Sequence, residues 1–435
     1  MMLAFVAAVL LSSGTSDGDG NWSGWRGPGA SGVASGSPPV EWSESKNVRW
    51  KAPLPGKGLA SPIVWGTHVF VATAVPTGKK LEGAPAGTTQ TQPPGTDPIE
   101  EQEFVVLALE RKSGAIAWDT KVATLMPHET THPDGSYASP TCVTDGEHVY
   151  ASFGSFGIYC LSMDGKLAWQ VDLGDMKVNG EFGEGSSPVL YGGSLILSWD
   201  HEGDSFLIAL DKQTGKERWR TPRPRGTSWA TPLVVQAGAA HEIVMAGART
   251  IAYDAETGRE LWHNGETPAE GGGAIASPVA VQELVLVAAG GRGGEVRALV
   301  ALPPEESGPE AEPLLWKQRA DGPSIPSPVA YDGMLYFLKN NSGMLSAMDS
   351  TSGEVKFGPQ RLQGVSDVYA SPVVASGHLY VAGRDGTVEV LSTWPEIKTL
   401  AVNRLEDGFD ASPAIAGDEL YLRGKNQLYC IAAGK

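Results

Sequence analysis

Short apolar runs alternate with polar turns along most of the chain and recur in a fixed order. Each repeat opens with Ser-Pro, or once Thr-Pro, followed by an apolar run, a Gly or Asp turn and a second run such as 148–151. A polar loop, a third run such as 207–210, a tight turn and a fourth run that usually bears an aromatic residue complete the repeat. Runs of this kind, with turn signals every ~8–12 residues, predict four antiparallel β-strands per repeat.

The dipeptide that opens the repeat occurs eight times. The copies are Ser61-Pro62, Ser139-Pro140, Ser187-Pro188, Thr231-Pro232, Ser277-Pro278, Ser327-Pro328, Ser371-Pro372 and Ser412-Pro413. The prolines are 41 to 50 residues apart, except for a first interval of 78 that contains an insertion at 75–103. A period of ~40–50 residues with four strands is typical of one propeller blade. The sequence therefore predicts an all-β fold, an eight-bladed β-propeller of four-stranded antiparallel blades.

The two ends of the chain complete one blade between them. The eighth repeat stops after its third strand, at 429–431, and a strand-like run at 47–51 precedes the first repeat. Pairing this N-terminal strand with the last blade closes the ring and removes two exposed sheet edges. We therefore expect the propeller to span 47–435, after a tail at 17–46.

An aromatic residue follows the turn glycine by four positions in most repeats. The pairs are Gly114/Trp118, Gly165/Trp169, Gly215/Trp219, Gly258/Trp262 and Gly353/Phe357, with Trp316 after a Pro/Glu-rich stretch and Leu400 in the seventh repeat. Glycine takes the positive φ of a tight turn, and large rings bury much apolar area. We predict that these rings dock each blade onto its neighbour.

These residues carry a family resemblance. The stretch 209–219, ALDKQTGKERW, resembles the repeat of the pyrroloquinoline-quinone-type β-propellers. The opening WSGWRG at 22–27, with Trp42 and Trp50, is similar to non-enzymatic, exported members such as the outer-membrane β-barrel assembly propeller family. The quinone dehydrogenases of this superfamily also carry two adjacent cysteines over the cofactor, and this chain has no adjacent pair.

The cysteine count excludes two kinds of structural site. Cys142, Cys160 and Cys430 are too few for a disulfide framework or a four-cysteine zinc site. Cys160 and Cys430 occupy equivalent strand positions in two repeats, so we expect all three to be buried, unpaired core residues.

Charge and the N-terminus bear on partners and location. The formal net charge of −17 excludes a general basic footprint for nucleic acid. The apolar run at 3–11, followed by small residues, predicts a secretory signal peptide at 1–16. No stretch reaches the ~20 apolar residues of a membrane span. We expect an exported, periplasmic or secreted monomer.

Two local motifs match patterns of known catalytic or binding sites, but the surrounding sequence disfavours such sites. The sequence HETTH at 128–132 matches the zinc-protease pattern, which requires a helix. Flanking prolines and internal threonines disfavour that helix, so we interpret the segment as a polar loop between blades. Glycine-rich stretches at 271–273 and 290–294 lack a strand-loop-helix context, so we interpret them as turns.

The loops between second and third strands give the main functional hypothesis. In a propeller these loops line one mouth of the central channel, and here several of them carry cations. The candidate binding residues are Asp200, His201, Glu202, Arg249, Arg292, Lys339, Asn340, Arg384 and Arg423. A cation-lined funnel suits a carboxylate-bearing ligand or an acidic peptide, whereas solvated and salt-bridged loop charges are the alternative.

The sequence thus favours a non-enzymatic protein that binds or scaffolds proteins or peptides in the cell envelope, with no cofactor. The alternative is an alcohol or sugar dehydrogenase that depends on pyrroloquinoline quinone and calcium. In that case the funnel cations hold the tricarboxylate cofactor, and Asp200 or Glu202 acts as the base.

Overall fold

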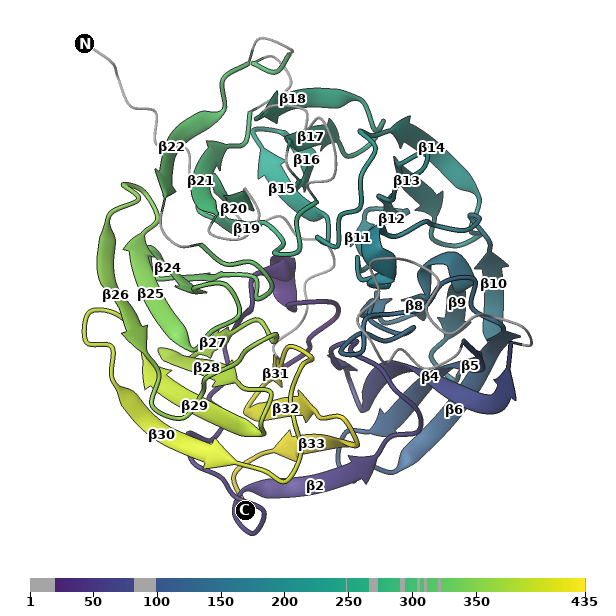
Figure 1. The fold of residues 1–435 in the computed structure, drawn as a ribbon, viewed down its shortest axis with the longest axis horizontal. Coiled ribbons are helices and arrows are strands. Elements are labelled where there is room, and N and C mark those ends of the chain that lie inside the picture. Colours follow the sequence, from purple (N-terminus) through teal and green to yellow (C-terminus); the bar gives the residue numbers. More distant parts are fainter. Residues whose placement is uncertain are drawn as a thin grey trace.

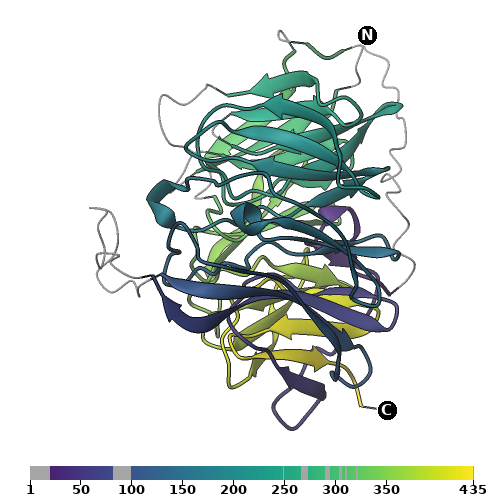
Figure 2. The ribbon, with the colours of Figure 1, turned by 90° about the vertical axis from the view of Figure 1, so that its right-hand side faces the viewer.

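The computed structural model describes residues 20–81, 99–247, 249–265, 273–289, 294–302, 306–308, 311–319 and 322–434. Eight β-sheets stand around a central axis (Figure 1), which confirms the predicted eight-bladed, all-β propeller. Seen from the side, the blades form a thick disc (Figure 2). The proposed signal peptide at 1–16 lies outside the described residues, and no described helix is long and apolar enough to cross a membrane.

Each blade is an antiparallel sheet whose first strand is innermost. Blade 1 contains β3 (Ile63–Trp65), β4 (His68–Lys80), β5 (Glu100–Glu110) and β6 (Ile116–Leu125). Blade 2 contains β7 (Val143–Thr144), β8 (His148–Ser152), β9 (Ile158–Ser162) and β10 (Leu167–Val171). Blade 3 contains β11 (Val189–Tyr191), β12 (Ser194–Trp199), β13 (Phe206–Asp211) and β14 (Glu217–Pro222). Blade 4 contains β15 (Leu233–Ala237), β16 (Ala240–Met245), β17 (Thr250–Asp254) and β18 (Glu260–Asn264).

The second half of the ring repeats this plan. Blade 5 contains β19 (Val279–Val281), β20 (Leu284–Ala289), β21 (Glu295–Val300) and β22 (Leu314–Arg319). Blade 6 contains β23 (Val329–Tyr331), β24 (Met334–Leu338), β25 (Met344–Asp349) and β26 (Val355–Arg361). Blade 7 contains β27 (Val373–Ala375), β28 (His378–Ala382), β29 (Thr387–Ser392) and β30 (Thr399–Arg404), with β1 (Val33–Ala34) added in parallel to β27. Three single-turn 3-10 helices occur at Pro28–Ala30 (η1), Gly154–Phe156 (η2) and Asn179–Glu181 (η3).

Blade 8 is assembled from both ends of the chain. Its strands are β31 (Ala414–Ala416), β32 (Glu419–Arg423), β33 (Gln427–Ile431) and, outermost, β2 (Val48–Pro53). Trp50 of β2 lies opposite Cys430 of β33 in antiparallel register. The predicted closure of the ring by the N-terminal strand is therefore confirmed.

A belt of hydroxyl groups links the starts of the inner strands. The backbone N–H of the Ser or Thr in each repeat donates to the hydroxyl of its counterpart in the next blade. Seven such bonds, 2.9–3.1 Å long, run through Ser61, Thr141, Ser187, Thr231, Ser277, Ser327, Ser371 and Ser412. In blade 2 the hydroxyl of this belt comes from Thr141, whereas Ser139 of the Ser139-Pro140 copy bonds to Ser136.

Most seams between blades hold an indole ring. The indole N–H groups of Trp50, Trp118, Trp169 and Trp316 donate to the carbonyls of Arg111, Met163, Lys212 and Ser350, in the third-to-fourth-strand turn of the next blade. Trp262 differs, because its indole N–H donates to Glu242 of its own blade at 3.1 Å. In blade 5 the stretch 301–313 replaces the compact turn that the other blades offer.

The three cysteines lie in the core, and the insertion extends a hairpin of blade 1. Cys142, Cys160 and Cys430 are buried and free, as expected. At the insertion, β4 continues to Lys80 and β5 begins at Glu100, so the hairpin extends beyond the other blades. Residues 82–98 lie outside the described part of the chain.

Candidate functional site

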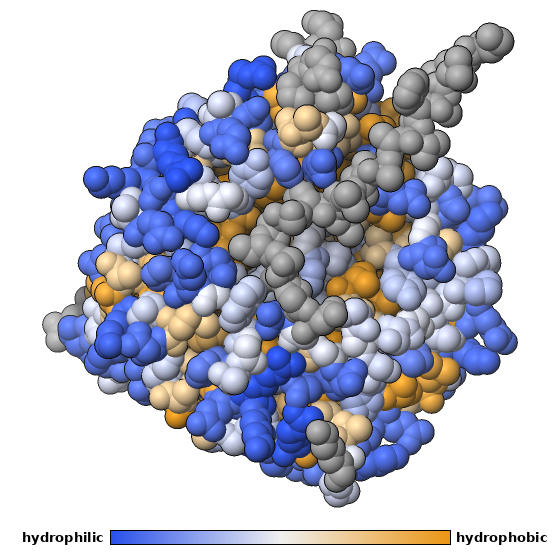
Figure 3. Space-filling model, turned by 180° about the vertical axis from the view of Figure 1, so that it is seen from behind, coloured by the Kyte–Doolittle hydropathy of each residue, from blue (hydrophilic) through white to orange (hydrophobic). Residues whose placement is uncertain are grey.

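The loops between second and third strands emerge on one face of the disc, together with the connections between blades. We call this the mouth face; it is turned toward the viewer in Figure 1. Because the strands are antiparallel, the hairpin turns between first and second strands lie on the opposite face. Figure 3 shows that opposite face, on which hydrophilic side chains dominate the rim.

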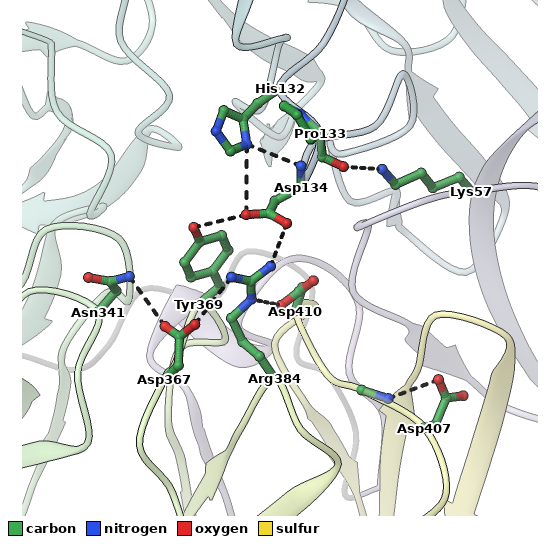
Figure 4. A network of polar contacts seen from close by, with 11 residues as sticks. Lys57, His132, Pro133, Asp134, Asn341, Asp367, Tyr369, Arg384, Asp407 and Asp410 are labelled. Atoms are coloured by element: carbon green, nitrogen blue, oxygen red, sulfur yellow. Dashed lines mark hydrogen bonds and ion pairs between the residues drawn. The ribbon is translucent and has the colours of Figure 1, made fainter. Parts of the chain in front are cut away.

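Arg384 is the centre of a polar network on the mouth face (Figure 4). Its Nε contacts Asp410 at 2.7 Å, one terminal nitrogen contacts Asp134 at 2.7 Å, and the other contacts Asp367 at 3.2 Å. The guanidinium carbon lies 3.9 Å from the centroid of the Tyr369 ring, and the Tyr369 hydroxyl donates to Asp134 at 3.3 Å. All three guanidinium nitrogens are therefore engaged by carboxylates of this chain.

The network joins the connections that precede blades 2, 7 and 8. Asp134 lies between blades 1 and 2, whereas Asp367 precedes blade 7 and Asp410 precedes blade 8. The ammonium of Lys57, before blade 1, donates to the carbonyl of Pro133 at 2.7 Å. The mouth is thus crossed by contacts between segments far apart in sequence (Figure 4).

Charge and burial set the ionisation of the network. Burial works to raise the pKa of Asp134, but the hydrogen bond and charge of Arg384 outweigh it and hold that pKa below its ordinary value. Burial lowers the pKa of Lys57, an effect that the nearby charge of Asp134 opposes. A carboxylate that is ionised and paired is a structural element rather than a free acceptor for a ligand.

Asp200, one of the predicted binding residues, is also paired. Its two carboxylate oxygens accept hydrogen bonds of 2.7 and 2.9 Å from Arg223, and both side chains are almost completely buried. Arg223 donates further to the hydroxyl of Tyr253 in the next blade at 2.9 Å. The pair therefore joins blades 3 and 4.

The two residues that follow hold backbone segments in place. His201 is buried, and its Nδ1 accepts the N–H of Lys177 at 3.0 Å. One carboxylate oxygen of Glu202 accepts both the N–H and the hydroxyl of Thr227, at 3.0 and 2.8 Å. Both oxygens of Asp200 are therefore paired, whereas Glu202 has one oxygen engaged.

Arg423, one of the predicted cations, is engaged by backbone carbonyls. Arg423 is buried at 3% exposure, and one terminal nitrogen donates to the carbonyls of Ala60 and Ala72 at 2.9 and 2.7 Å. This contact seals the seam between blades 8 and 1. Burial without a paired carboxylate lowers the pKa of Arg423 to about 10.

The other predicted residues occupy separate loops. Lys339 and Asn340 follow β24, where Asn340 takes a φ of 54° and its backbone bridges to Pro323. Arg249 is half-buried immediately before β17. Arg292 lies outside the described residues.

Glu184, which the sequence analysis did not select, stands out among the acidic groups of this face. Its carboxylate accepts the N–H and the hydroxyl of Ser155 in η2, at 2.8 and 2.5 Å. Burial raises the pKa of Glu184 to about 7, although the bonds from Ser155 work against the rise. The isolated Glu in a Gly-Glu-Gly stretch carries no pattern by which the sequence could have marked it.

Two adjoining pockets between blades 2 and 3 share Glu184 as a wall. Both also contact Pro140, Val178 and Gly183, and the second reaches Trp229 and Ser198. The first is lined by part of the 128–132 segment, which forms no helix. There Glu129 accepts the N–H of Val178 at 2.9 Å, so the HETTH motif acts as a loop that packs between blades.

The opposite end of the channel is occupied by residues 20–34. Trp22 pairs with Val64 of blade 1 through two 2.8 Å backbone bonds, and β1 then adds to blade 7. Between them Arg26 is 1% exposed and donates to the carbonyls of Pro328 and Pro372 at 2.7 and 3.3 Å. The WSGWRG motif therefore ties blades 1, 6 and 7 together across the axis.

Comparison with known families assigns this architecture. The family model described as outer membrane protein assembly factor BamB, a PQQ-type repeat family, matches residues 101–246, 154–303 and 247–362. These matches span more than half of the chain, so the protein belongs to this propeller family. A search of curated proteins finds no match.

Several solved structures share the fold at low sequence identity. The quinohemoprotein alcohol dehydrogenase from Comamonas testosteroni has a TM-score of 0.64 and 11% identity, over 95% of this chain and 81% of that one. A europium-containing methanol dehydrogenase has a TM-score of 0.61 and 12% identity, over 94% and 91%. BamB from Moraxella catarrhalis has a TM-score of 0.43 and 18% identity, over 67% and 93%. The two dehydrogenase likenesses show the propeller fold alone.

A bound tricarboxylate quinone makes specific demands on the side chains at the mouth. Such a group needs cations whose donors face the funnel. The nitrogens of Arg384 already contact three aspartates, and Arg423 is buried against carbonyls. These two residues do not fit the role that the cation-lined funnel assigned to them.

Proposed function

We propose that the protein is an exported, non-enzymatic β-propeller that binds or scaffolds proteins or peptides in the cell envelope, as a monomeric unit without a cofactor. The observation that carries this proposal is the occupation of both ends of the channel by the chain itself. The Arg384 network crosses the mouth face, and the segment around Arg26 crosses the opposite face. Binding is then left to the periphery of the disc, where outer strands and seams meet the solvent.

Family membership supports this proposal. The matching family model is described as an assembly factor for outer membrane proteins. A rigid ring suits a docking platform, because a preorganised surface lowers the entropic cost of association.

The alternative, a dehydrogenase that depends on pyrroloquinoline quinone and calcium, draws on one observation. The pockets beside Glu184 contain a carboxyl group with a pKa raised to about 7, which suits a general base at neutral pH. In that alternative Glu184 replaces Asp200 and Glu202 as the candidate base, because those two are engaged by Arg223 and Thr227.

Two measurements separate the functions. For the proposed function, a photo-reactive amino acid is placed at Gln318 on an outer strand and, as a control, at buried Leu286, and cells are irradiated. We expect covalent adducts to an envelope protein from Gln318 only. If none of the exposed outer-strand positions gives adducts, the proposal is overturned.

The purified protein is also incubated with pyrroloquinoline quinone and calcium and assayed for dye-linked oxidation of alcohols and sugars. We expect no turnover and no shift in quinone absorbance. Turnover that is lost in Glu184→Gln would establish the alternative instead. Fractionation of cells, with the protein recovered outside the cytoplasm, tests export.

A further inference from the structure

The seam between blades 6 and 7 lacks the indole that five other seams of the ring share. In five seams an indole lies over the turn glycine of the next blade, so that an added Cβ would meet the ring within 2.4–2.8 Å. These indoles belong to Trp50, Trp118, Trp169, Trp219 and Trp316. Blade 6 presents the smaller ring of Phe357 from β26 at this place. Blade 7 presents the longer turn 393–398 in place of the compact one.

The smaller ring and the longer turn leave a groove open to solvent between β26 and the β29–β30 hairpin. These outer strands are neighbours on the rim (Figure 1). Apolar side chains form the walls: Leu345, Phe357, Leu362, Leu391 and Ile397. These apolar side chains, set among polar lining residues, favour an apolar or aromatic side chain, because burial removes both surfaces from water.

The rim of the groove carries hydrogen-bond donors. Arg361, Gln360 and Gln363 are exposed at the end of β26 and just beyond it. Among the described residues, Arg361 has no ion pair or hydrogen-bond partner for its side chain. Lys398 stands on the facing edge with only an exposed contact of 3.3 Å to Glu396. In a chain with a net charge of −17, this local group of cations favours a partner that is acidic around its anchor.

A buried carboxylate lies beneath the floor of the groove. Glu389 is fully buried, and its oxygens accept from the hydroxyl of Thr399 at 2.7 Å and from the N–H of Gly364 at 2.9 Å. Each carboxylate oxygen retains capacity for a second donor. Elsewhere in this chain the buried Glu242 accepts the indole N–H of Trp262 at 3.1 Å, so the ring already contains an indole-carboxylate contact of this kind.

We propose that the groove between blades 6 and 7 binds the tryptophan side chain of an extended, acidic segment of a partner protein. The indole takes the place that an intramolecular indole fills in five other seams, and the flanking carboxylates of the segment meet Arg361 and Lys398. This inference rests on the proposed function, since it names the chemistry of the partner and the surface that receives it.

A fluorine-labelled peptide tests the proposal on the full-length protein. The probe is Ac-Glu-Asp-Trp-Glu-Asp-NH2 with 5-fluorotryptophan, observed by 19F NMR. We expect line broadening and a shifted resonance on titration with wild-type protein. A peptide with alanine in place of tryptophan, or with lysines in place of the acidic residues, competes at least tenfold more weakly.

Three variants locate the site. Phe357→Trp fills the groove with the chain's own indole, so we expect it to lose probe binding at least tenfold while raising the melting temperature. Arg361→Glu loses binding at least tenfold with an unchanged melting temperature. Arg319→Glu, the same charge reversal on the outer strand of blade 5, leaves binding within twofold. Equal binding by wild type and Phe357→Trp overturns the proposal.

The other possible outcomes identify a different occupant of the groove or show which proposal fails. If free N-acetyl-tryptophan binds as tightly as the peptide, the ligand is a small aromatic acid and the partner segment is wrong. If sedimentation shows a dimer that Phe357→Trp dissociates, the occupant is a second copy of this chain. If photo-adducts form from Gln318 but the probe does not bind, this inference fails and the proposed function stands. If no adducts form from any position, both this inference and the proposed function fail.

Discussion

At the scale of single residues, the mouth face shows how charges that look like a binding site in sequence become structural. Arg384 and Asp200 both lie in loops where the sequence places candidate ligands, and both find carboxylate or guanidinium partners within the chain. The partners come from other connections, tens to hundreds of residues away. Sequence identifies the loop and its charge but not the partner, because the partner is set by how the ring brings the connections together.

Removing the central cation of the network tests its structural role. Arg384→Gln leaves three aspartates near one another without their cation, and we expect a loss of about 2–3 kcal/mol in the free energy of unfolding. Arg384 retains 17% exposure of its side chain, so screening keeps the effect below that of a fully buried pair. Urea unfolding at pH 7 measures it, with Arg319→Gln as the exposed control.

The same variant has a defined pH dependence. The pKa of Asp134 is lowered in the folded state, so its pairing with Arg384 stabilises the protein above the unfolded value of 3.8 and is lost as the pH falls through the folded pKa. The gap between wild type and Arg384→Gln should therefore narrow below pH 4. A gap that stays constant down to pH 3 would mean that the ion pairs contribute nothing.

Glu184 gives the opposite pH dependence. Its pKa is raised from 4.5 to about 7 by burial, so folding favours the protonated form. Stability from this group is complete below pH 4.5 and declines as the pH rises toward 7. We expect Glu184→Gln to flatten this decline in unfolding experiments between pH 4.5 and 8. Parallel curves for the variant and the wild type would show that the carboxyl group stays ionised throughout.

At the scale of the structural elements, five seams place an indole ring over the turn glycine of the next blade. Gly165 has a φ of 83°, and an added Cβ would lie 2.6 Å from the Trp118 ring. Gly192 also has a positive φ, 53°, but an added Cβ meets nothing within 4 Å. The two positions separate backbone strain from steric contact with the indole.

Alanine substitutions at these two glycines test that separation. We expect Gly192→Ala to cost about 1 kcal/mol from the left-handed backbone alone. Gly165→Ala should cost about 2–4 kcal/mol, since the ring must also move from the seam. Thermal and urea unfolding measure both free energies. Equal losses would show that the indole yields without cost.

The elements themselves could be predicted well because their signals are local. Ser-Pro, the alternation of apolar runs and the Gly-to-Trp spacing recur in most blades, and the blade count followed from them. The hydroxyl belt has no such signal: in blade 2 the hydroxyl comes from Thr141 and not from the Ser139-Pro140 copy of the dipeptide. The path of residues 20–34 across the axis could not be predicted, because its contacts with blades 1, 6 and 7 have no periodic signal.

At the scale of the whole molecule, one seam closes the ring and the others join blades consecutive along the chain. Trp50 and Trp169 are a matched pair for comparing them. The indole N–H of Trp50 donates to Arg111 at 2.9 Å, and its ring lies 6.0 Å from that of Tyr421. The corresponding distances for Trp169 are 3.0 Å to Lys212 and 6.1 Å to Tyr150.

Because these local contacts are alike, Trp50→Ala and Trp169→Ala should lose similar free energies of unfolding, about 3 kcal/mol each. Their local opening should differ, because β2 joins blade 8 from the other end of the chain, whereas β10 follows β9 directly in blade 2. Hydrogen exchange measured by mass spectrometry should show faster exchange across β2 and β31–β33 and at β3 in Trp50→Ala. In Trp169→Ala it should rise only in blades 2 and 3. If both variants exchange faster only next to the substituted residue, the pairing of the chain ends adds nothing beyond an ordinary seam, and the ring does not depend on its closing strand.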